Sequence, residues 1–338
     1  MLTQFNNSIF IHHALSAQES REAFLRIMSG KCTAVQIAAL LTALHQDGEN
    51  AEEITGAAQA MRALGSHVDA GSSDVMVDIV GTGGDALSTI NISTIACFVA
   101  AGAGCVVAKH GNRAVTGKCG AADLLSALGV NLDASEETAA ACIRTHGIGF
   151  LFAQRLHPAM RYAAPVRREL KFRTIFNLLG PLTNPAGVRN HLIGVFAPQY
   201  TQIFAEVLKQ LGSHRAMIVC GEDGMDELSV CAPSQVSQLD ADGTISSFTV
   251  RPEEYFGTRY EIAALRGGDA SENATIARKI LAGQGTVAQQ SAVLLNAAAA
   301  LVVGGVASTL ADGLTRAEES LRSGAAQHKL DELVEAYR

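Results

Sequence analysis

The chain has 338 residues, of which 48% are apolar and 17% are charged, and its formal net charge is −7. This length allows two domains with large cores, and the composition excludes the disordered and fibrous classes of protein. The negative charge also argues against a broad nucleic-acid-binding surface, because such a surface needs an excess of Lys and Arg to displace counterions.

Several features bear on the cellular compartment. The seven cysteines are scattered and form no C-x-x-C pair, which favours reduced thiols. Residues 1–16 lack the basic region and apolar stretch of a secretory signal. The apolar stretch 291–310 is rich in Ala and is interrupted by Asn296, so it predicts a buried core helix rather than a membrane span. We therefore expect a cytoplasmic protein without a membrane segment.

Residues 1–70 show helical periodicity. Apolar residues recur at spacings of three and four, and each stretch ends in glycine, a common helix C-cap, in 23–30, 33–48 and 51–65. A Gly/Ser-rich break follows at 67–74. The pattern predicts a small helical domain that ends near residue 70.

From residue 75 onward, short apolar runs alternate with helical stretches, which is typical of β-α-β units and a mostly parallel central sheet. The runs lie at 75–80, 105–110, 149–153, 191–197 and 216–221. A hairpin with a D-A-D-G turn is expected over 234–250, followed by helices. We predict an α/β domain formed by 75–159 and 188–338, with the intervening residues 160–187 joining the helical domain.

A glycine-rich loop, "GTGGD", follows the first predicted strand at 81–85. Its glycines leave room for a ligand to approach the backbone, and the next residues start a helix with Thr89, Asn91, Ser93 and Thr94. A helix N-terminus favours anions, so the loop predicts a phosphate site. Two alternatives remain, namely that the glycines serve only a tight turn and that the polar residues are ordinary N-caps.

The same loop also satisfies the dinucleotide pattern G-x-G-x-x-A. A dinucleotide site needs an acid near the end of the second strand to hold the ribose hydroxyls. That position carries Lys109 and His110 instead, which disfavours such a site. These two residues begin the stretch "KHGNRAVTGKCGAAD" at 109–123, where Arg113 and Lys118 add further charge. We predict a second anion-binding loop here; the alternative is a solvated charged surface.

Two further groups of charged residues carry possible chemistry. Arg167 and Lys171 are four residues apart on a predicted helix and are expected on one face, either as a binding site or as exposed cations. Asp226 and Glu227 follow the last parallel strand. Adjacent carboxylates at a strand end suit Mg²⁺, which takes one or two carboxylates together with substrate phosphates. The alternative is a pair of surface acids, and in either case we expect exposed loop positions.

The combination of these motifs resembles one enzyme family. The motifs occur in the family's order as "GTGGD", "NIST", "KHGNR", "HPAM", "VRREL", "RTIFNLLGPLTNPA" and "MDELS". The chain is thereby similar to the anthranilate phosphoribosyltransferases of tryptophan biosynthesis. The resemblance implies a homodimer of the nucleoside phosphorylase and phosphoribosyltransferase type, with a small helical domain and a larger α/β domain. It also implies that the amine of anthranilate displaces pyrophosphate from phosphoribosyl pyrophosphate (PRPP) with the help of Mg²⁺.

The resemblance also implies roles for individual residues. Those matching the family's PRPP site are Gly81, Gly84, Asp85, Thr89, Asn91, Ile92, Ser93, Thr94, Lys109, His110, Gly111, Asn112, Arg113, Ala114, Val115, Thr116, Gly117 and Ala121. Those matching the anthranilate site are Gly81, Asn112 and Arg167, and those matching the metal site are Ser93, Asp226 and Glu227. No general acid or base is implied.

The chain departs from the family pattern in the two loops. Non-hydroxyl residues stand where the family usually has Ser, and the first loop lacks one usual Gly, at Ala114, Gly117, Cys119, Ala121 and Ala86. We therefore expect weakened affinity for PRPP. Two other functions predict different sequence features. A pyrimidine nucleoside phosphorylase would lack the "VRREL" and "MDELS" pairing, and a non-catalytic nucleic-acid-binding paralogue would carry a basic surface and a degraded metal site.

Overall fold

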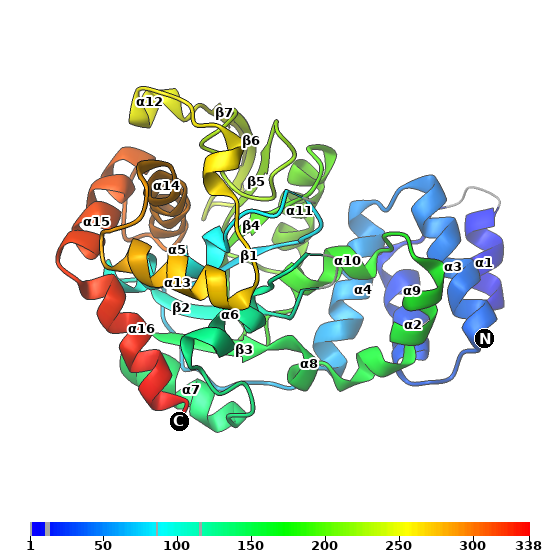
Figure 1. Cartoon of the computed structure of the whole chain (residues 1–338). Coiled ribbons are helices and arrows are strands. Elements are labelled where there is room, and N and C mark those ends of the chain that lie inside the picture. Colours follow the sequence, from blue (N-terminus) through cyan, green and yellow to red (C-terminus); the bar gives the residue numbers. More distant parts are fainter. Residues whose placement is uncertain (1, 11–13, 86, 115–116) are drawn as a thin grey trace.

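The computed structural model describes residues 2–10, 14–85, 87–114 and 117–338. The N-terminal helices gather at one end of the molecule and the sheet lies at the other (Figure 1). These helices are α1 (Thr3–Phe10), α2 (Ala17–Met28), α3 (Ala34–Asp47) and α4 (Ala51–Leu64). The helices predicted within residues 1–70 are confirmed as α2, α3 and α4.

Local sequence sets where these helices begin. The N-cap side chains of Ser16, Thr33 and Asn50 each accept a hydrogen bond from the backbone N–H three residues later, and the side chain of that later residue returns to the N-cap backbone. Such capping boxes satisfy backbone N–H groups that the first helical turn leaves unpaired. The starts of α2, α3 and α4 therefore follow from short-range interactions.

Within the described residues, seven strands form one sheet in the order β3-β2-β1-β4-β5-β6-β7. The strands are β1 (Met76–Gly81), β2 (Val106–Gly111), β3 (Ile148–Phe152), β4 (Asn190–Gly194), β5 (Arg215–Gly221), β6 (Ser234–Leu239) and β7 (Ile245–Val250). The first five pair in parallel, and the last two add an antiparallel hairpin. All five predicted strands and the predicted hairpin are confirmed.

Both faces of the sheet are buried. Along β5, Met217 and Val219 join one hydrophobic core, whereas Ile218 and Cys220 join the other. Alternate side chains of a strand point to opposite faces, so a strand that contributes to two cores reads as a continuous apolar run. This explains why the runs could be recognised in the sequence without a period-two pattern.

Helices cover these two faces. Those of the α/β part are α5 (Ile92–Gly102), α6 (Ala121–Leu128), α7 (Glu136–His146), α11 (Gln199–Gln210), α12 (Glu253–Phe256), α13 (Ala270–Leu281), α14 (Val287–Val303), α15 (Leu310–Arg322) and α16 (Ala325–Ala336), with a 3₁₀ turn at Ile262–Leu265. Helix α14 is almost wholly buried, which confirms the predicted core helix. Within the described ranges, no helix combines the length and apolarity that crossing a membrane requires.

The segment between β3 and β4 packs against the N-terminal helices. It comprises α8 (Ala153–Leu156), α9 (Ala164–Leu170), α10 (Phe176–Leu179) and 3₁₀ turns at Pro158–Tyr162 and Gly180–Leu182. The rings of Phe24 and Phe176 pack edge to face with their centres 5.4 Å apart. Arg62 Nε donates a hydrogen bond to the Leu182 carbonyl at 2.7 Å. This packing supports the proposal that 160–187 belongs with the helical domain.

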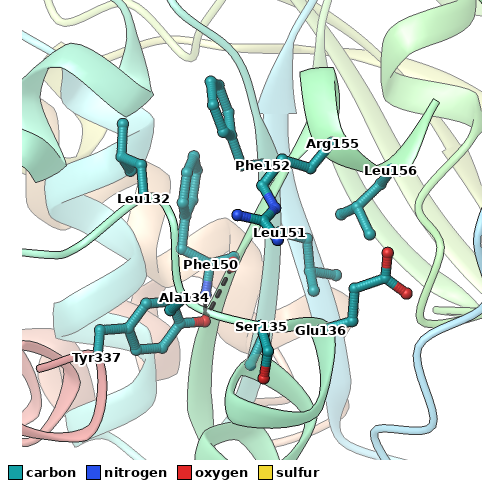
Figure 2. A pocket seen from close by; sticks show the side chains of 11 residues that line it. Leu132, Ala134, Ser135, Glu136, Phe150, Leu151, Phe152, Arg155, Leu156 and Tyr337 are labelled. Atoms are coloured by element: carbon teal, nitrogen blue, oxygen red, sulfur yellow. Dashed lines mark hydrogen bonds between the residues drawn. The ribbon is translucent and has the colours of Figure 1, made fainter. Parts of the chain in front are cut away.

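The C-terminal helix protects the free edge of the sheet at β3. The Tyr337 hydroxyl accepts a hydrogen bond from the Phe150 N–H at 2.8 Å and donates one to the Phe150 carbonyl at 2.9 Å. Figure 2 shows this contact beside a pocket of about 20 Å³, which holds little more than one water. One side chain thus satisfies two backbone groups that an edge strand would otherwise leave unpaired.

We expect Tyr337→Phe to lower the free energy of unfolding by about 1–3 kcal/mol, because it leaves the buried N–H and carbonyl of Phe150 without partners. Urea denaturation measures this change. Tyr255→Phe is the matched control, since no hydrogen bond of the Tyr255 hydroxyl is seen among the described residues, and it should change stability by less than about 0.5 kcal/mol. Equal effects of the two substitutions would contradict the edge-capping role.

Candidate functional site

The strand order reverses between β1 and β4, which lie side by side at the centre of the sheet. The chain leaves β1 toward β2 on one side and leaves β4 toward β5 on the other. In open α/β sheets, ligands bind outside the carboxyl ends of the strands at such a reversal. Here those ends are Gly81 and Gly194, which are paired in register. The topology therefore places a site at the loop that follows β1.

The two glycines make room for an acidic residue. A Cβ atom added to Gly194 would lie 1.5 Å from the Asp226 carbonyl oxygen, and one added to Gly81 would lie 2.3 Å from Asp226 Oδ2. Any larger side chain at either position would therefore push Asp226 out of place. Gly81 was predicted to allow close approach to the backbone, and the group that approaches it in this structure is the Asp226 carboxylate.

The acidic pair contacts both parts of the predicted phosphate site. Asp226 Oδ2 accepts a hydrogen bond from the Gly83 N–H at 2.6 Å, and Glu227 Oε1 accepts one from the Ser93 N–H at 3.0 Å. The structure thus brings together the glycine-rich loop, the start of α5 and the loop after β5. The expectation that the acids are exposed is wrong, because both are half-buried against these backbone groups.

Burial raises the pKa of the Asp226 carboxyl, and the nearby charges of Glu227 and Asp85 raise it further. Burial also raises the pKa of the Glu227 carboxyl, although the positive charge of Lys109 opposes this. Two carboxylates that lie this close suit a divalent cation, which would offset their negative charge. Within the described ranges, no group of three or more His, Cys, Asp or Glu side chains could hold a metal by itself. This donor set fits Mg²⁺, which completes its coordination with water and substrate phosphates.

Lys109 and His110 lie on opposite faces of β2, since successive strand residues alternate. Lys109 is 4% exposed, and its Nζ donates to the Ile79 carbonyl at 2.7 Å on the α5 side. His110 lies on the other face, where its Nδ1 is 3.2 Å from the Gly180 carbonyl and its Nε2 is 3.2 Å from His157 Nε2. Burial lowers the pKa of His110 to about 3, so the ring is neutral. The prediction that His110 adds positive charge to the second loop is therefore wrong.

An acid of its own chain organises the second loop. Asp123 Oδ2 accepts hydrogen bonds from the N–H groups of Ala114 at 2.9 Å and Gly120 at 3.0 Å, and Asp123 Oδ1 pairs with Arg113 at 2.8 Å. Within this loop Asn112, Gly117 and Lys118 are exposed. The predicted site residues Val115 and Thr116 lie outside the described residues, as does Ala86 of the first loop.

Arg167 lies on α9, where its side chain is half-buried with the guanidinium 5.5 Å from the centre of the Phe176 ring. Burial lowers its pKa, and no hydrogen-bond or ion-pair partner of the guanidinium is found among the described residues. The predicted pairing with Lys171 on one helical face is wrong, because Lys171 ends the helix in the left-handed conformation with φ of 57°.

Sequence reasoning assigned no role to Arg173, although the structure places it at the site. Its guanidinium donates to the Gly84 carbonyl and lies over the Phe196 ring, 4.0 Å from the ring centre. Arg173 therefore links the segment between β3 and β4 to the glycine-rich loop. A single Arg within a stretch rich in Pro and Asn carries no periodicity or spacing that could have revealed this contact.

A cavity larger than the pocket beside Tyr337 lies away from the carboxyl ends of the parallel strands. It has a volume of about 590 Å³ and lies at the opposite edge of the sheet, between Arg215 at the start of β5, Asp240 after β6 and Val306 after α14. The glycine-rich loop, the start of α5 and the acidic pair all lie at the carboxyl edge instead. The cavity therefore does not include any of the described residues predicted to bind phosphate or Mg²⁺.

Comparisons with known proteins identify relatives over the whole chain. The family described as "Glycosyl transferase family, a/b domain" matches residues 73–327, and "Glycosyl transferase family, helical bundle domain" matches residues 4–65. An anthranilate phosphoribosyltransferase from Desulfosudis oleivorans is 48% identical over 99% of this chain and 98% of its own length. The solved anthranilate phosphoribosyltransferase from Thermus thermophilus is similar, with a TM-score of 0.92 and 41% identity over 98% of this chain and 99% of its own. The enzyme from Saccharomyces cerevisiae in complex with PRPP and Mg has a TM-score of 0.90 and 28% identity, covering 99% of this chain and 97% of its own.

Proposed function

Because this chain belongs to the anthranilate phosphoribosyltransferase family, we propose that its active site is the group of loops at the carboxyl edge of β1, β2, β4 and β5. The enzyme is a pentosyltransferase of tryptophan biosynthesis that transfers the phosphoribosyl group of PRPP to the amine of anthranilate and releases pyrophosphate. The observation that carries the assignment is that Asp226 is hydrogen-bonded to the glycine-rich loop and Glu227 to the start of α5.

PRPP binds, in this proposal, where the backbone N–H groups of the first loop converge. The N–H groups of Gly83 and Ser93 each donate to a carboxylate oxygen in this structure, which supports their use as donors to negatively charged oxygen. Phosphate oxygens have the same chemistry, and the N-terminus of α5 adds a favourable dipole. The loop after β2 covers the phosphates from the other side, with Arg113 and Lys118 as its exposed cations.

The residues proposed to hold Mg²⁺ are Ser93, Asp226 and Glu227. Ser93 and Glu227 are already hydrogen-bonded to one another, and Asp226 is next to Glu227 in the chain. When bound, the cation neutralises negative charge on the departing pyrophosphate. The relative from Saccharomyces cerevisiae that was solved with PRPP and Mg supports this use of the metal.

The residues proposed to contact anthranilate are Gly81, Asn112 and Arg167. The planar guanidinium of Arg167 matches a carboxylate with two parallel hydrogen bonds, and it has no competing partner among the described residues. Loss of pyrophosphate gives an oxocarbenium-like transition state. The protein therefore contributes mainly by positioning the amine and by placing Lys109 and backbone N–H groups near the charge that develops. We assign no general base.

The test of this function is a steady-state assay in which anthranilate fluorescence is followed with PRPP and Mg²⁺. We expect saturable consumption that requires both PRPP and the metal. A panel of other aromatic amines defines specificity, and phosphorolysis of uridine tests the nucleoside phosphorylase alternative. Uridine cleavage without anthranilate consumption would contradict the proposal.

We also propose a homodimer in the cytoplasm. The resemblance to the family supports the dimer, and Val35 on α3 of the helical part is 79% exposed, as an apolar residue at an interface would be in an isolated protomer. The seven cysteines are all free, which supports a reducing compartment. Light scattering that gives the monomer mass at micromolar concentration would contradict the dimer.

The departures from the family pattern predict a gain of affinity on reversal. An added Cβ at Gly117 meets no atom of the described residues within 4 Å, and the φ of Gly117 is outside the left-handed region, so these residues leave room for Ser there. We expect the triple substitution Ala114→Ser, Gly117→Ser and Ala121→Ser to lower the KM for PRPP several-fold, since each hydroxyl that meets a phosphate is worth about 1 kcal/mol.

The KM for anthranilate should stay almost unchanged in the triple variant. Ala311→Ser, at an exposed position on α15, is the control and should change neither constant. Titration calorimetry with PRPP checks the direct effect on binding. Equal or weaker binding by the triple variant would mean that this loop does not contact the phosphates through these positions.

A further inference from the structure

Two buried asparagines on the C-terminal helices are not explained by the packing of those helices. Asn273 on α13 is 2% exposed and Asn296 on α14 is fully buried. Burying an amide is unfavourable unless its donors and acceptor are paired. Asn296 interrupts an apolar run in which Leu or Ala would suit the core and the helix better. Both side chains are paired, and each has one partner at the proposed active site, which is Leu228 for Asn296 and Asn91 for Asn273.

Asn296 holds the backbone next to the acidic pair. Its Oδ1 accepts a hydrogen bond from the Leu228 N–H at 3.0 Å, and its Nδ2 donates to the Leu228 carbonyl at 3.0 Å. The same Nδ2 donates to the Ala292 carbonyl one helical turn earlier, at 2.9 Å. Since both backbone groups of Leu228 are held by one side chain, the position and rotation of the preceding residue, Glu227, are restrained from α14.

Asn273 holds the start of α5 in a similar way. Its Oδ1 accepts a hydrogen bond from the Gly268 N–H at 2.7 Å, and its Nδ2 donates to Asn91 Oδ1 at 3.0 Å. Asn91 Nδ2 in turn donates to the Cys119 carbonyl at 2.9 Å, in the loop after β2. Asn91 is the N-cap residue of α5, yet its side chain makes no capping bond because it is used in this chain of contacts.

We infer that Asn273 and Asn296 are positioning residues, the first for the two loops that bind PRPP and the second for the acidic pair that binds Mg²⁺. Neither needs to touch a substrate. Each requires an amide, because one oxygen must accept while one nitrogen donates. The inference rests on the proposed function, and it adds that the C-terminal helices align two halves of the site that are far apart in sequence.

The test compares Asn273→Ala with Asn296→Ala, each of which is the matched control for the other. Asn296→Ala should raise the Mg²⁺ concentration for half-maximal activity about tenfold or more, because loss of a group that orients a metal ligand typically weakens metal binding by that factor. Its KM for PRPP at saturating Mg²⁺ should stay within about twofold of wild type. Asn273→Ala should raise the KM for PRPP about tenfold at saturating Mg²⁺, with the Mg²⁺ requirement almost unchanged.

Two binding measurements do not depend on turnover. Mn²⁺ titration in the presence of PRPP, followed by electron paramagnetic resonance, should show weaker metal binding only for the Asn296 variant. Calorimetry with PRPP at saturating Mg²⁺ should show weaker binding only for the Asn273 variant. A double-mutant cycle of Asn91→Ala with Asn273→Ala should be non-additive in the KM for PRPP, because the two side chains share one hydrogen bond.

A merely structural role for the two asparagines predicts a different result. Both variants would then lose stability in urea, and both kinetic constants would change by the same factor or not at all, which would overturn the inference. If an Ala variant does not fold, the Ser variant at that position replaces it in the same comparison. A wild-type protein that fails to consume anthranilate overturns the proposed function instead, so the two failures are distinguishable.

Discussion

Replacing Asp226 with Asn and Glu227 with Gln is expected to reduce Mg²⁺-dependent turnover about a thousandfold or more, because the charge on the leaving pyrophosphate is then no longer neutralised by a bound cation. The amides keep oxygens that can accept from the Gly83 and Ser93 N–H groups, so the loop contacts persist. Initial rates over a Mg²⁺ series measure the loss. Wild-type activity of the double variant at low Mg²⁺ would place the metal elsewhere.

The same substitution should stabilise the protein at pH 8. The pKa of both carboxyls is raised in the folded state, above all by burial. A carboxyl with a raised pKa contributes most to stability below its unfolded pKa, and this contribution is lost as the pH rises through the folded pKa. At pH 8 the charged pair therefore destabilises the metal-free protein.

We expect the double amide to be more stable than wild type at pH 8 by on the order of 1 kcal/mol or more. The difference should shrink as the pH falls toward 4, where the unfolded carboxyls also become protonated. Urea denaturation at both pH values, without Mg²⁺, measures it. Glu254→Gln, at an exposed position on α12, is the control and should show no such difference. A less stable double amide at pH 8 would contradict this electrostatic account.

Arg167→Ala is expected to raise the KM for anthranilate roughly 10- to 150-fold, because it removes a bidentate charge-assisted contact worth about 1.5–3 kcal/mol. PRPP binding should stay nearly intact. Arg167→Lys should not restore the KM, since an ammonium cannot reproduce the planar pair of donors. Steady-state kinetics with each substrate varied in turn give both constants.

Arg168 supplies the matched control for Arg167. It is the next residue on α9 and is exposed, so Arg168→Ala alters the same helix and the same net charge without removing the half-buried guanidinium. We expect its kinetic constants to match those of wild type. An unchanged KM for anthranilate in Arg167→Ala, or an equal rise in Arg168→Ala, would remove Arg167 from the anthranilate site.

Much of the fold could be predicted because its signals are local. Apolar residues at spacings of three and four, together with the closing glycines, predicted the helices within 1–70, and the strands read as apolar runs because both faces of the sheet are buried. The opposite orientation of Lys109 and His110 could also have been predicted, since strand residues alternate. Treating the two residues together as cations of one loop ignored that alternation.

Other features of the site could not be predicted, because they depend on contacts between distant segments. No local pattern shows that Asp226 packs against Gly81 and Gly194, or that Arg173 donates a hydrogen bond to the Gly84 carbonyl. Asn296 is recognisable in the sequence as a polar residue within an apolar helix, but the sequence does not indicate that its partner is Leu228. Such contacts arise only when the loops meet at the carboxyl edge of the sheet.

A crystal structure of this protein with PRPP, Mg²⁺ and an anthranilate analogue that lacks the amine tests the central claim most directly. We expect the pyrophosphate on the N–H groups of Gly83 and Ser93, the metal between it and the Asp226 and Glu227 carboxylates, and the analogue's carboxylate on Arg167. PRPP bound away from these groups, for example in the cavity beside Arg215 and Asp240 at the opposite edge of the sheet, would contradict the account.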